Sequence, residues 1–398
     1  MPPRDRRPLE GRRLWFVGIG GAGLSAYAQV ARAWGAEVGG WDRVETPYLR
    51  PLRDVEVRIS SEPEAPAGWE VVVSTAYAGR VDGRPREELL AELVSLRRSI
   101  VVAGAHGKTT TTAMIAFCLE RLGLDPAFVV GGEIPQLGGN AGTGEGWFVV
   151  EGDESDRSVA ALRPEIAVLL NVDLDHHTTF GSRAEVQRLF EEWLVDVPHV
   201  VRAEELTPID LPLAVAGAHN RLNATAAIAA LDLAGVDRAA AEGAIVEFTG
   251  AARRLERRGD ARGVEVVDDY AHHPAEIAAT IAALRERSAR RVLVLFQPHL
   301  YSRTLHLAHE FACALAGADA VCIAEIYGAR EEPVEGVSGR LLVRELARVR
   351  PGMRIGWAPT VEEGARVVAG WARAGDVVAT LGAGDVDTAV PVLLEAVG

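Results

Sequence analysis

Ile100-Val-Val-Ala-Gly-Ala-His-Gly-Lys-Thr-Thr-Thr-Thr112 is the stretch of sequence that decides the fold. Its apolar start, residues 100–103, predicts a buried strand, and the pattern of residues 109–122 predicts a helix that ends before Gly123. A glycine-rich turn between a strand and a helix is typical of phosphate-binding α/β domains. The turn keeps the Gly-Lys-Thr end of the P-loop pattern, whereas Val102 stands where that pattern has its first glycine.

Lys108 is the single lysine in a chain that has 42 lysines and arginines in total. An ammonium is a compact point charge, and a phosphate cradle suits it better than a planar guanidinium. Gly104 and Gly107 leave backbone N–H groups available to phosphate oxygens, and Thr109 offers a hydroxyl to Mg²⁺. The loop therefore predicts a nucleoside triphosphate site at Lys108.

The amino-terminal segment has a second glycine turn between a strand and a helix. Residues 14–17 predict a strand, Gly18-Ile-Gly-Gly-Ala-Gly23 the turn, residues 24–34 a helix, and residues 37–41 a strand that ends at Asp42. This spacing matches the dinucleotide fingerprint, in which a diphosphate lies on a helix N-terminus and an acid binds a ribose hydroxyl. The pattern does not identify the nucleoside, and a tight turn without a ligand remains the alternative interpretation.

Apolar strands alternate with helical segments along the rest of the chain. The predicted strands are residues 71–75, 147–150, 166–170, 264–267, 292–296, 320–324 and 376–381, and the predicted helices are residues 85–98, 217–233 and 274–285. This alternation indicates an α/β fold with mostly parallel sheets. We expect three tandem domains: a Rossmann-like N-terminal domain (1–98), a P-loop-type central ATPase domain (99–250) and a Rossmann-like C-terminal domain (251–398).

Two predicted strands downstream of the lysine loop end in polar residues. Glu151-Gly-Asp-Glu-Ser-Asp156 follows one strand, and Asn171-Val-Asp-Leu-Asp-His-His177 follows the next. The carboxyl ends of parallel strands are where an α/β sheet binds its ligands. Carboxylates, an amide and an occasional imidazole suit a hard cation such as Mg²⁺, although solvated acidic loops are the alternative interpretation.

Two further strand ends carry polar residues in the C-terminal region. They are Asp268-Asp-Tyr-Ala-His-His-Pro274 and Gln297-Pro-His-Leu-Tyr-Ser-Arg-Thr304. Adjacent histidines invite a zinc interpretation, but neighbouring residues point in different directions and no third ligand stands at a suitable spacing. A substrate-facing rim, with an arginine for a carboxylate, is the better interpretation.

Composition excludes several classes of function. The net charge of −14 and the lack of a basic stripe argue against a general nucleic-acid binder. No apolar run approaches the roughly 20 residues that a membrane span needs, so we expect no membrane insertion. The three cysteines lack metal-ligand spacing, and we expect reduced, mostly buried thiols in a cytoplasmic protein.

Taken in order, these segments resemble the Mur ligases, and most closely the members that act on UDP-N-acetylmuramate and L-alanine. The resemblance spans residues 18–385. Its motifs are residues 18–23, 104–112, 151–156, 175–176, 219–223, 248–254, 268–274, 296–304 and 382–385. Together these motifs are far more specific than any one glycine loop.

The resemblance implies an ATP-dependent ligase that joins L-alanine to the carboxylate of UDP-N-acetylmuramate through an acyl phosphate, for peptidoglycan precursor synthesis. ATP and Mg²⁺ are the implied cofactors, and closure of the domains would assemble the site. Lys108, His272 and Arg303 are the implied catalytic residues, and Thr109, Glu151 and His176 the metal ligands. The implied ATP-binding residues are Gly104, His106, Gly107, Lys108, Thr109, Thr110, His219, Asn220, Asn223, Arg254 and Asp269. The implied UDP-binding residues are Gly18, Gly20, Gly21, Ala22, Gly23, Asp42 and Ser74.

The chain also departs from the family pattern. Some Mur ligases bridge two Mg²⁺ ions with a carbamoylated lysine, and this chain has no second lysine to modify. Leu300 stands where many relatives have an arginine, so recognition of the amino-acid carboxylate would rest on Arg303. The chain is short for the family, with trimmed stretches at residues 76–99 and 198–217.

Three other functions stay open at this stage. A recycling ligase would attach a ready-made peptide to the same sugar acid. An NAD(P)-dependent oxidoreductase would use residues 18–23 and Asp42 but would leave Lys108 without a role. A non-catalytic nucleotide-binding regulator would not need so complete a catalytic set. The sequence indicates neither an oligomeric state nor a preference among alanine, glycine and serine.

Overall fold

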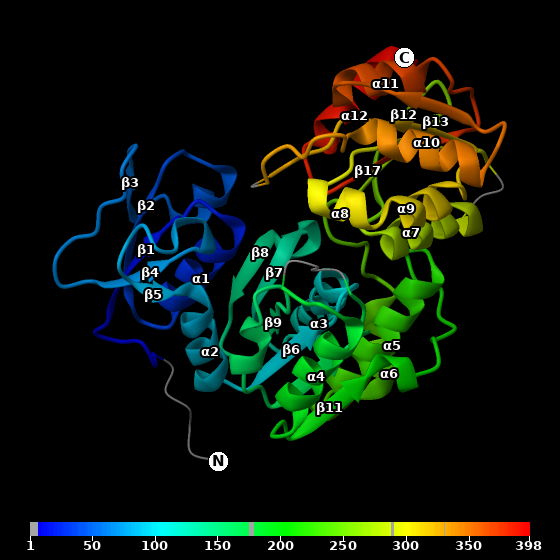
Figure 1. Ribbon diagram of the computed structural model, residues 1–398. Coiled ribbons are helices and arrows are strands. Elements are labelled where there is room, and N and C mark those ends of the chain that lie inside the picture. The colour runs from blue at the N-terminus through cyan, green and yellow to red at the C-terminus, as the bar shows by residue number, and fades with distance from the viewer. Residues whose placement is uncertain (1–6, 175–178, 288–289, 330) are drawn as a thin grey trace. The chain divides into compact units, whose positions relative to one another are not determined.

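The structure is a computed structural model that describes residues 7–174, 179–287, 290–329 and 331–398. It contains three β-sheets with helices packed on them (Figure 1). The chain forms two compact units: residues 1–212 with 222–251, and residues 213–221 with 252–398. The first unit holds the first two sheets together, so the domain boundary expected at residue 98 stays a prediction.

The first sheet is entirely parallel, with strand order β3-β2-β1-β4-β5. Its central strand β1 is buried on both faces, because Leu14 and Phe16 join the main core while Trp15 and Val17 pack on the other side with Trp41. The elements are β1 (Arg13–Val17), α1 (Ala22–Ala33), β2 (Glu37–Asp42), η1 (Pro47–Leu52), β3 (Glu56–Ile59), β4 (Glu70–Val73), η2 (Thr75–Tyr77), β5 (Arg84–Pro85) and α2 (Arg86–Leu96).

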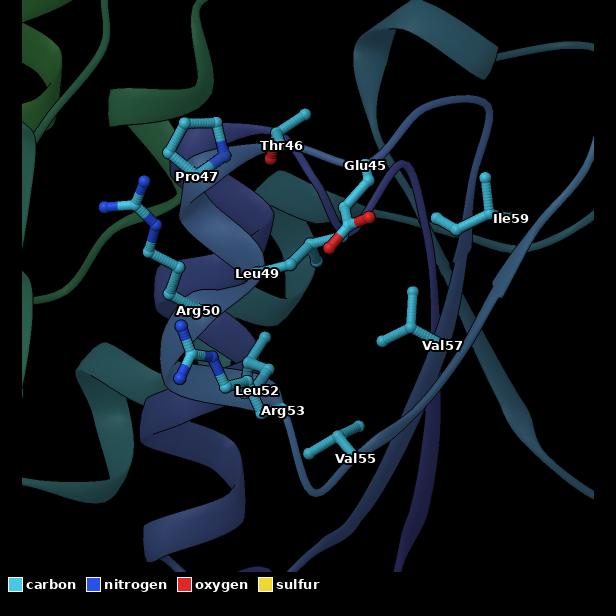
Figure 2. A pocket seen from close by; sticks show the side chains of 10 residues that line it. All are labelled: Glu45, Thr46, Pro47, Leu49, Arg50, Leu52, Arg53, Val55, Val57 and Ile59. Atoms are coloured by element: carbon cyan, nitrogen blue, oxygen red, sulfur yellow. The ribbon is translucent and has the colours of Figure 1, made fainter.

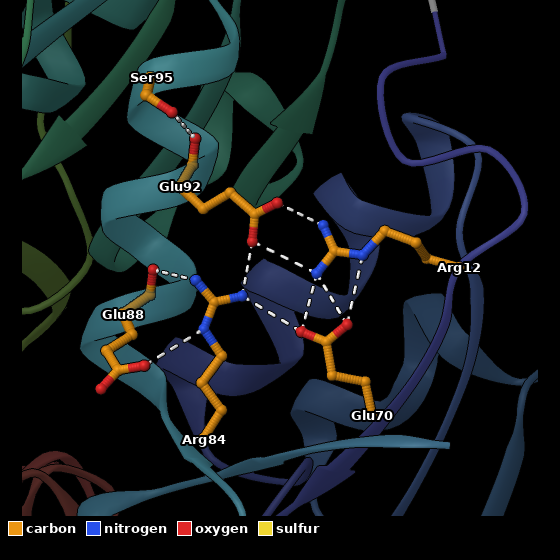
Figure 3. Close-up of polar contacts among 6 residues, drawn as sticks. All are labelled: Arg12, Glu70, Arg84, Glu88, Glu92 and Ser95. Carbon is orange, nitrogen blue, oxygen red and sulfur yellow. Dashed lines mark hydrogen bonds and ion pairs between the residues drawn. The ribbon is translucent and has the colours of Figure 1, made fainter. Parts of the chain in front are cut away.

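A network of four charged side chains joins the first sheet to helix α2 (Figure 3). The side chains come from the residue before β1, from β4, from β5 and from α2. Arg12, just before β1, bonds Glu70 at 2.7 Å and also contacts Glu92. Arg84 in β5 reaches the same two acids and donates to the backbone carbonyl of Glu88 at 2.6 Å. Each charge lies between two opposite charges, and the side chains are only 22–36% exposed. The network therefore fastens α2 to the sheet.

We expect the substitution Glu92→Gln to destabilise the protein, because it removes one of the two acids that both arginines share and the one that lies on α2. Partly buried pairs exceed the roughly 0–1 kcal/mol of an exposed pair, so we expect a loss of about 1–2 kcal/mol that shrinks at high salt. Thermal unfolding at two salt concentrations measures it. The control is Glu88→Gln, whose side chain is 62% exposed and lies 3.6 Å from Arg84. Equal losses in both variants would contradict the network's role.

The second sheet has the order β11-β10-β6-β9-β7-β8 and is parallel except for the β7–β8 pair. The lysine loop follows its strand β6, so the ends of β9 and β10 flank that loop. The elements are β6 (Ser99–Ala103), α3 (Lys108–Arg121), β7 (Ala127–Ile134), η3 (Pro135–Leu137), β8 (Gly139–Thr143), β9 (Phe148–Glu151), η4 (Ser158–Ala161), β10 (Ile166–Leu169), α4 (Arg183–Leu194), β11 (His199–Arg202), η5 (Ala203–Glu205), α5 (Ala218–Leu233) and α6 (Arg238–Ile245).

The third sheet forms the second unit, with the order β12-β13-β17-β14-β15-β16 and one antiparallel pair, β12–β13. Alternate residues of β14 explain its layers: Val294 and Phe296 pack with α7, α9 and α10, whereas Leu293 and Leu295 pack with α11 and α12. The elements are β12 (Glu256–Ala261), β13 (Val264–Asp269), α7 (Pro274–Arg287), β14 (Val292–Phe296), α8 (Tyr301–His306), α9 (Ala308–Leu315), β15 (Ala320–Ile323), α10 (Gly339–Val349), β16 (Arg354–Trp357), α11 (Val361–Ala369), β17 (Val377–Leu381), η6 (Val386–Thr388) and α12 (Ala389–Val397).

These sheets confirm the predicted α/β fold with mostly parallel strands. Among the described residues, no helix has the length and apolar character that crossing a bilayer requires. The three cysteines are free, and burial raises the pKa of Cys118 and of Cys322 to about 12. Two of the three thiols are buried, which confirms the expectation of mostly buried thiols, and the third, Cys313 in α9, is exposed with its Sγ 3.5 Å from Nε2 of His309.

Candidate active site

The lysine loop between β6 and α3 contains two glycines that no other residue replaces without strain. Gly104 has φ of 131°, and a Cβ there would lie 2.9 Å from the backbone N and O of Asn171. Gly107 has φ of 87°, and its Cβ would lie 2.7 Å from Oδ1 of Asn223. Positive φ and close packing are both conditions that only glycine meets at no cost. The loop therefore lies tightly against the residues that follow β10 and against α5.

Asn171 fixes the loop through a two-way bond with His106. Its Nδ2 donates to the His106 carbonyl at 2.8 Å, and its Oδ1 accepts from the His106 N–H at 2.9 Å. The His106 ring lies 3.7 Å from a carboxylate oxygen of Asp173. The sequence pointed to Asn171 only as a neighbour of a metal, whereas its amide here serves the loop backbone.

The ammonium of Lys108 is directed back into its own loop. Its Nζ donates to the Gly104 carbonyl at 2.7 Å and lies 2.9 and 3.0 Å from the two carboxylate oxygens of Glu154. Burial lowers the pKa of Lys108, but the neighbouring carboxylates of Glu154, Asp153 and Glu151 raise it by more, so the pKa lies above its ordinary value. Lys108 therefore carries a full positive charge at neutral pH.

Thr109 and Glu151 lie side by side, as expected for two ligands of one ion. The Thr109 hydroxyl donates to a carboxylate oxygen of Glu151 at 3.2 Å, and the other oxygen accepts the Gly131 N–H at 2.6 Å. Hydroxyl and carboxylate oxygens are the donors that Mg²⁺ prefers, so these residues fit that ion. The third predicted ligand, His176, lies outside the described residues. Thr110 is buried in the same first turn of α3.

The glycine turn before α1 is held by Asp42 and packs closely against Ser74. Asp42 Oδ2 accepts the Gly20 N–H at 2.7 Å, and its Oδ1 accepts the N–H of Arg43 at 2.7 Å. Gly18 has φ of 90°, and a Cβ on it would lie 2.5 Å from the Ser74 hydroxyl. Gly21, Ala22 and Gly23 then begin α1, where backbone N–H groups have no partner inside the helix. Asp42 thus holds the turn, and its predicted contact with a ribose stays a prediction.

A pocket of about 630 Å³ lies between η1 and β3, next to the glycine turn (Figure 2). Thr46 connects the two, because it lines the pocket and its hydroxyl donates to the Gly20 carbonyl at 2.7 Å. Apolar side chains from both elements point into the pocket, and three charged residues lie at its margin. The lining residues are Glu45, Thr46, Pro47, Leu49, Arg50, Leu52, Arg53, Val55, Val57 and Ile59. None of the predicted site residues is among them.

Arg86 joins the glycine turn to the acidic segment after β9. Its Nη2 lies 3.8 Å from a carboxylate oxygen of Asp153 and 3.8 Å from one of Asp156. Its Nη1 would lie 3.2 Å from a Cβ on Gly23. Asn140 in β8 adds a second link, since its Nδ2 donates to the Ala22 carbonyl at 2.9 Å. The start of α1 and the acids near Lys108 therefore belong to one continuous surface of the first unit.

Helix α5 carries the residues predicted for the adenine. Asn223 lies against Gly107, as described above, and Asn220 donates from Nδ2 to the Ala216 carbonyl at 2.7 Å. Burial lowers the pKa of His219, against the opposing effect of Glu276. A neutral imidazole at physiological pH follows, and this form can lie flat against an aromatic base.

The residues predicted at the C-terminal strand ends gather within the second unit. Arg254 lies over the Tyr270 ring at 5.2 Å, and its Nη1 is 3.9 Å from Glu276. His272 lies edge-on to the same ring, with its Nδ1 3.0 Å from the Tyr270 carbonyl. Burial raises the pKa of Asp269 to about 6. Arg254 and His272, which the sequence singled out, therefore lie close together around Tyr270.

Arg303 and its neighbours extend this group. Arg303 is 5% exposed, and its Nη1 lies 3.5 Å from Nδ1 of His299. The His299 ring contacts the His272 ring, with centroids 5.9 Å apart. Leu300 begins α8 with φ of 71°, an uncommon conformation for a branched residue. Arg303 is the cationic side chain that α8 places beside these histidines.

Comparison with known proteins matches both the motifs and the fold. Residues 102–201 match the Mur ligase middle domain, and residues 253–384 match the Mur ligase, glutamate ligase domain. A UDP-N-acetylmuramate–L-alanine ligase of Paenarthrobacter aurescens is 37% identical over 450 aligned positions that cover 97% of each chain. The chain belongs to the Mur ligase family. It is therefore an ATP-dependent ligase that forms amide bonds.

A second relative and a crystal structure are also similar to this Mur ligase over nearly its whole length. The UDP-N-acetylmuramate–L-alanine ligase of Streptomyces coelicolor is 38% identical over 96% of each chain. The crystal structure of the corresponding Thermotoga maritima enzyme superposes with a TM-score of 0.78, with 27% identity, over 96% of this chain and 98% of that one. The first alignment has 450 positions, whereas this Mur ligase has 398 residues. The alignment therefore places gaps in this chain, as expected of a short member of the family.

Two charged residues of this Mur ligase were not singled out by sequence reasoning. Glu154 is one of four acids within residues 151–156, and nothing in that run marks it as the partner of Lys108. Arg86 begins a charged helix, and only the fold brings it to Gly23.

Proposed function

We propose that this Mur ligase joins L-alanine to the carboxylate of UDP-N-acetylmuramate, with release of ADP and phosphate. The observation that carries the proposal is the identity of 36–39% over nearly the whole chain to relatives that are UDP-N-acetylmuramate–L-alanine ligases. The geometry supports it, because a phosphate loop and a second glycine turn lie on one compact unit, as two nucleotide substrates require.

The proposed reaction has two displacements. The muramyl carboxylate oxygen attacks the γ-phosphorus of ATP, and ADP leaves. The amine of L-alanine then attacks the acyl carbon, and phosphate leaves. Both steps depend on positioning and charge neutralisation more than on a protein nucleophile. Lys108 supplies a partly buried positive charge for the phosphoryl group. The first turn of α3, whose N–H groups have no partner inside the helix, is proposed to bind the phosphates.

The proposed Mg²⁺ site uses Thr109 and Glu151, with His176 retained from the sequence as a third ligand. When bound, Mg²⁺ neutralises phosphate charge. Glu151 keeps the Thr109 hydroxyl in place through the bond at 3.2 Å. His219, Asn220 and Asn223 are proposed for the adenine. Arg254 and Asp269 are proposed for the nucleotide, and His272 and Arg303 for the amino acid.

The UDP end is proposed to lie on the glycine turn. Gly18, Gly20 and Gly23 allow close approach of the diphosphate, and the start of α1 offers its N–H groups. Asp42 holds the turn in shape by accepting the Gly20 N–H, and Ser74 lies close to Gly18. The cytoplasmic location expected from the sequence stays a prediction.

The test is release of phosphate from ATP in a matrix of substrates. We expect release only when UDP-N-acetylmuramate and L-alanine are both present, together with a product whose mass equals their sum less water. Parallel reactions replace L-alanine with glycine, L-serine or a ready-made tripeptide that has a free amine. Release with the tripeptide but not with L-alanine would overturn the proposal and favour a recycling ligase.

We expect the substitution Arg86→Ala to raise the KM for UDP-N-acetylmuramate. Without the guanidinium, Asp153 and Asp156 repel the diphosphate bound on the neighbouring turn. The expected rise is about tenfold, which corresponds to about 1.4 kcal/mol. Steady-state kinetics with each substrate varied measures it. Arg32→Ala, at the opposite end of α1, is the control, and an unchanged KM in Arg86→Ala would remove Arg86 from the site.

A further inference from the structure

Lys108 and Glu154 form a close ion pair at the phosphate loop, with Nζ 2.9 Å from a carboxylate oxygen. Glu154 is 2% exposed, and both of its carboxylate oxygens lie within 3.0 Å of Nζ. The Gly104 carbonyl accepts at 2.7 Å from the same atom. An ammonium has three donors, so these two groups occupy its directions of hydrogen bonding.

Glu154 is placed to hold the ammonium independently of any nucleotide. The residue follows β9, and its own backbone carbonyl accepts the Arg157 N–H at 2.9 Å, which fixes the turn. The Lys108 side chain is 18% exposed. A partly buried ammonium without a carboxylate is costly, and a pair with good geometry reduces that cost. The carboxylate thus keeps Lys108 charged and in one position within the loop.

The same carboxylate opposes the binding of a triphosphate. Phosphate oxygens that bind Lys108 bring a second negative group to an ammonium that Glu154 already neutralises. Charges of the same sign repel more strongly in a buried site than in water. Glu154 therefore has opposite effects on the two stages: it weakens ground-state binding of ATP, and it orients the cation that stabilises the transferred phosphoryl group.

We propose that Glu154 is a positioning residue for Lys108, which lowers the affinity for ATP in exchange for faster phosphoryl transfer. This inference rests on the proposed ATP site. A merely structural residue would change stability or the fraction of active enzyme, and it would not tighten ATP binding. The signature is thus a split between affinity and turnover.

The experiment compares Glu154→Gln with the wild-type chain. Calorimetry with a non-hydrolysable ATP analogue and Mg²⁺ gives affinity, and phosphate release gives kcat. We expect the dissociation constant to fall about threefold to tenfold, because a negative charge is lost. We expect kcat to fall at least about tenfold, because a poorly held catalytic group costs up to about a hundredfold.

A matched control removes the same charge elsewhere on the sheet. Glu165 directly precedes β10, at the end of the strands opposite the loop, and pairs with Arg98 at 2.7 Å. Glu165→Gln should leave affinity and kcat within about twofold of wild type, as for other substitutions away from the site. Weaker analogue binding by Glu154→Gln, or an unchanged kcat, would overturn the inference.

A second variant covers the case in which Glu154→Gln does not fold. Glu154→Asp keeps the charge but shortens the side chain by one methylene, so we expect wild-type affinity with a reduced kcat. Wild-type values of both quantities in this variant would overturn the inference. Should the wild-type chain bind the analogue without coupling L-alanine, the proposed function fails, and the affinities still decide the role of Glu154.

Discussion

Replacing Lys108 with arginine is expected to abolish phosphate release from ATP while the fold stays intact. The Gly104 carbonyl and Glu154 form a cradle for a compact ammonium, and a planar guanidinium does not fit the same three directions. We expect turnover to fall about 10²–10³-fold or more, the usual cost of losing one group that stabilises charge in the transition state. Phosphate release and a thermal unfolding curve measure the two halves of this expectation.

The control for that variant is the reverse exchange at an exposed site. Arg163→Lys replaces a guanidinium whose Nη1 donates to the Ala160 carbonyl at the surface of the same unit, and its turnover should stay within about twofold. Near-normal turnover by Lys108→Arg would refute the role of the lysine. A large fall in unfolding temperature would instead show that the loop tolerates no larger cation.

Gly107→Ala is expected to destroy nucleotide binding. Its backbone has φ of 87°, and the added Cβ would lie 2.7 Å from Asn223 Oδ1 and 3.2 Å from Leu170 Cδ1. A non-glycine residue in this conformation costs about 1–3 kcal/mol, and relief of that strain reshapes the loop. We expect no measurable binding of an ATP analogue by calorimetry, with a lower unfolding temperature.

Gly243→Ala provides a matched control because this glycine lies inside α6 with nothing within 4 Å of an added Cβ. Alanine at an exposed helical position should stabilise the protein by about 0.5–1 kcal/mol and leave binding unchanged. Tight analogue binding by Gly107→Ala would mean that the loop conformation changes on binding.

Much of this fold follows from apolar runs that alternate with glycine turns. The strands β6, β9, β10, β14 and β17 were predicted within about two residues, because each is a short run of mostly buried, mostly apolar residues. The edge strands β3, β5 and β11 were not predicted. Their residues are polar or very few, so only hydrogen bonding to a neighbouring strand makes them strands. The antiparallel strand β8 was also not predicted, because its glycine-rich residues have no apolar pattern and only pairing with β7 makes them a strand.

The candidate site shows the same division between local and long-range information. Gly104, Gly107 and Thr109 could be predicted because a contiguous motif encodes their roles. The acids of residues 151–156 could not be ranked, since each of them offers the same carboxylate. Only the fold shows that Glu151 meets Thr109 and that Glu154 meets Lys108. The link from Arg86 to the glycine turn joins residues 63 positions apart, 86 less 23, and no local pattern records it.

The partly buried position of the chain's one lysine has a practical consequence for chemical labelling. Apart from the α-amino group, Nζ of Lys108 is the single amine in the protein, so an amine-selective reagent has one side-chain target. Its ion pair with Glu154 keeps that amine protonated and therefore unreactive until the pair is broken. The rate at which the Lys108 amine is acylated consequently reports how often the ion pair between Lys108 and Glu154 breaks.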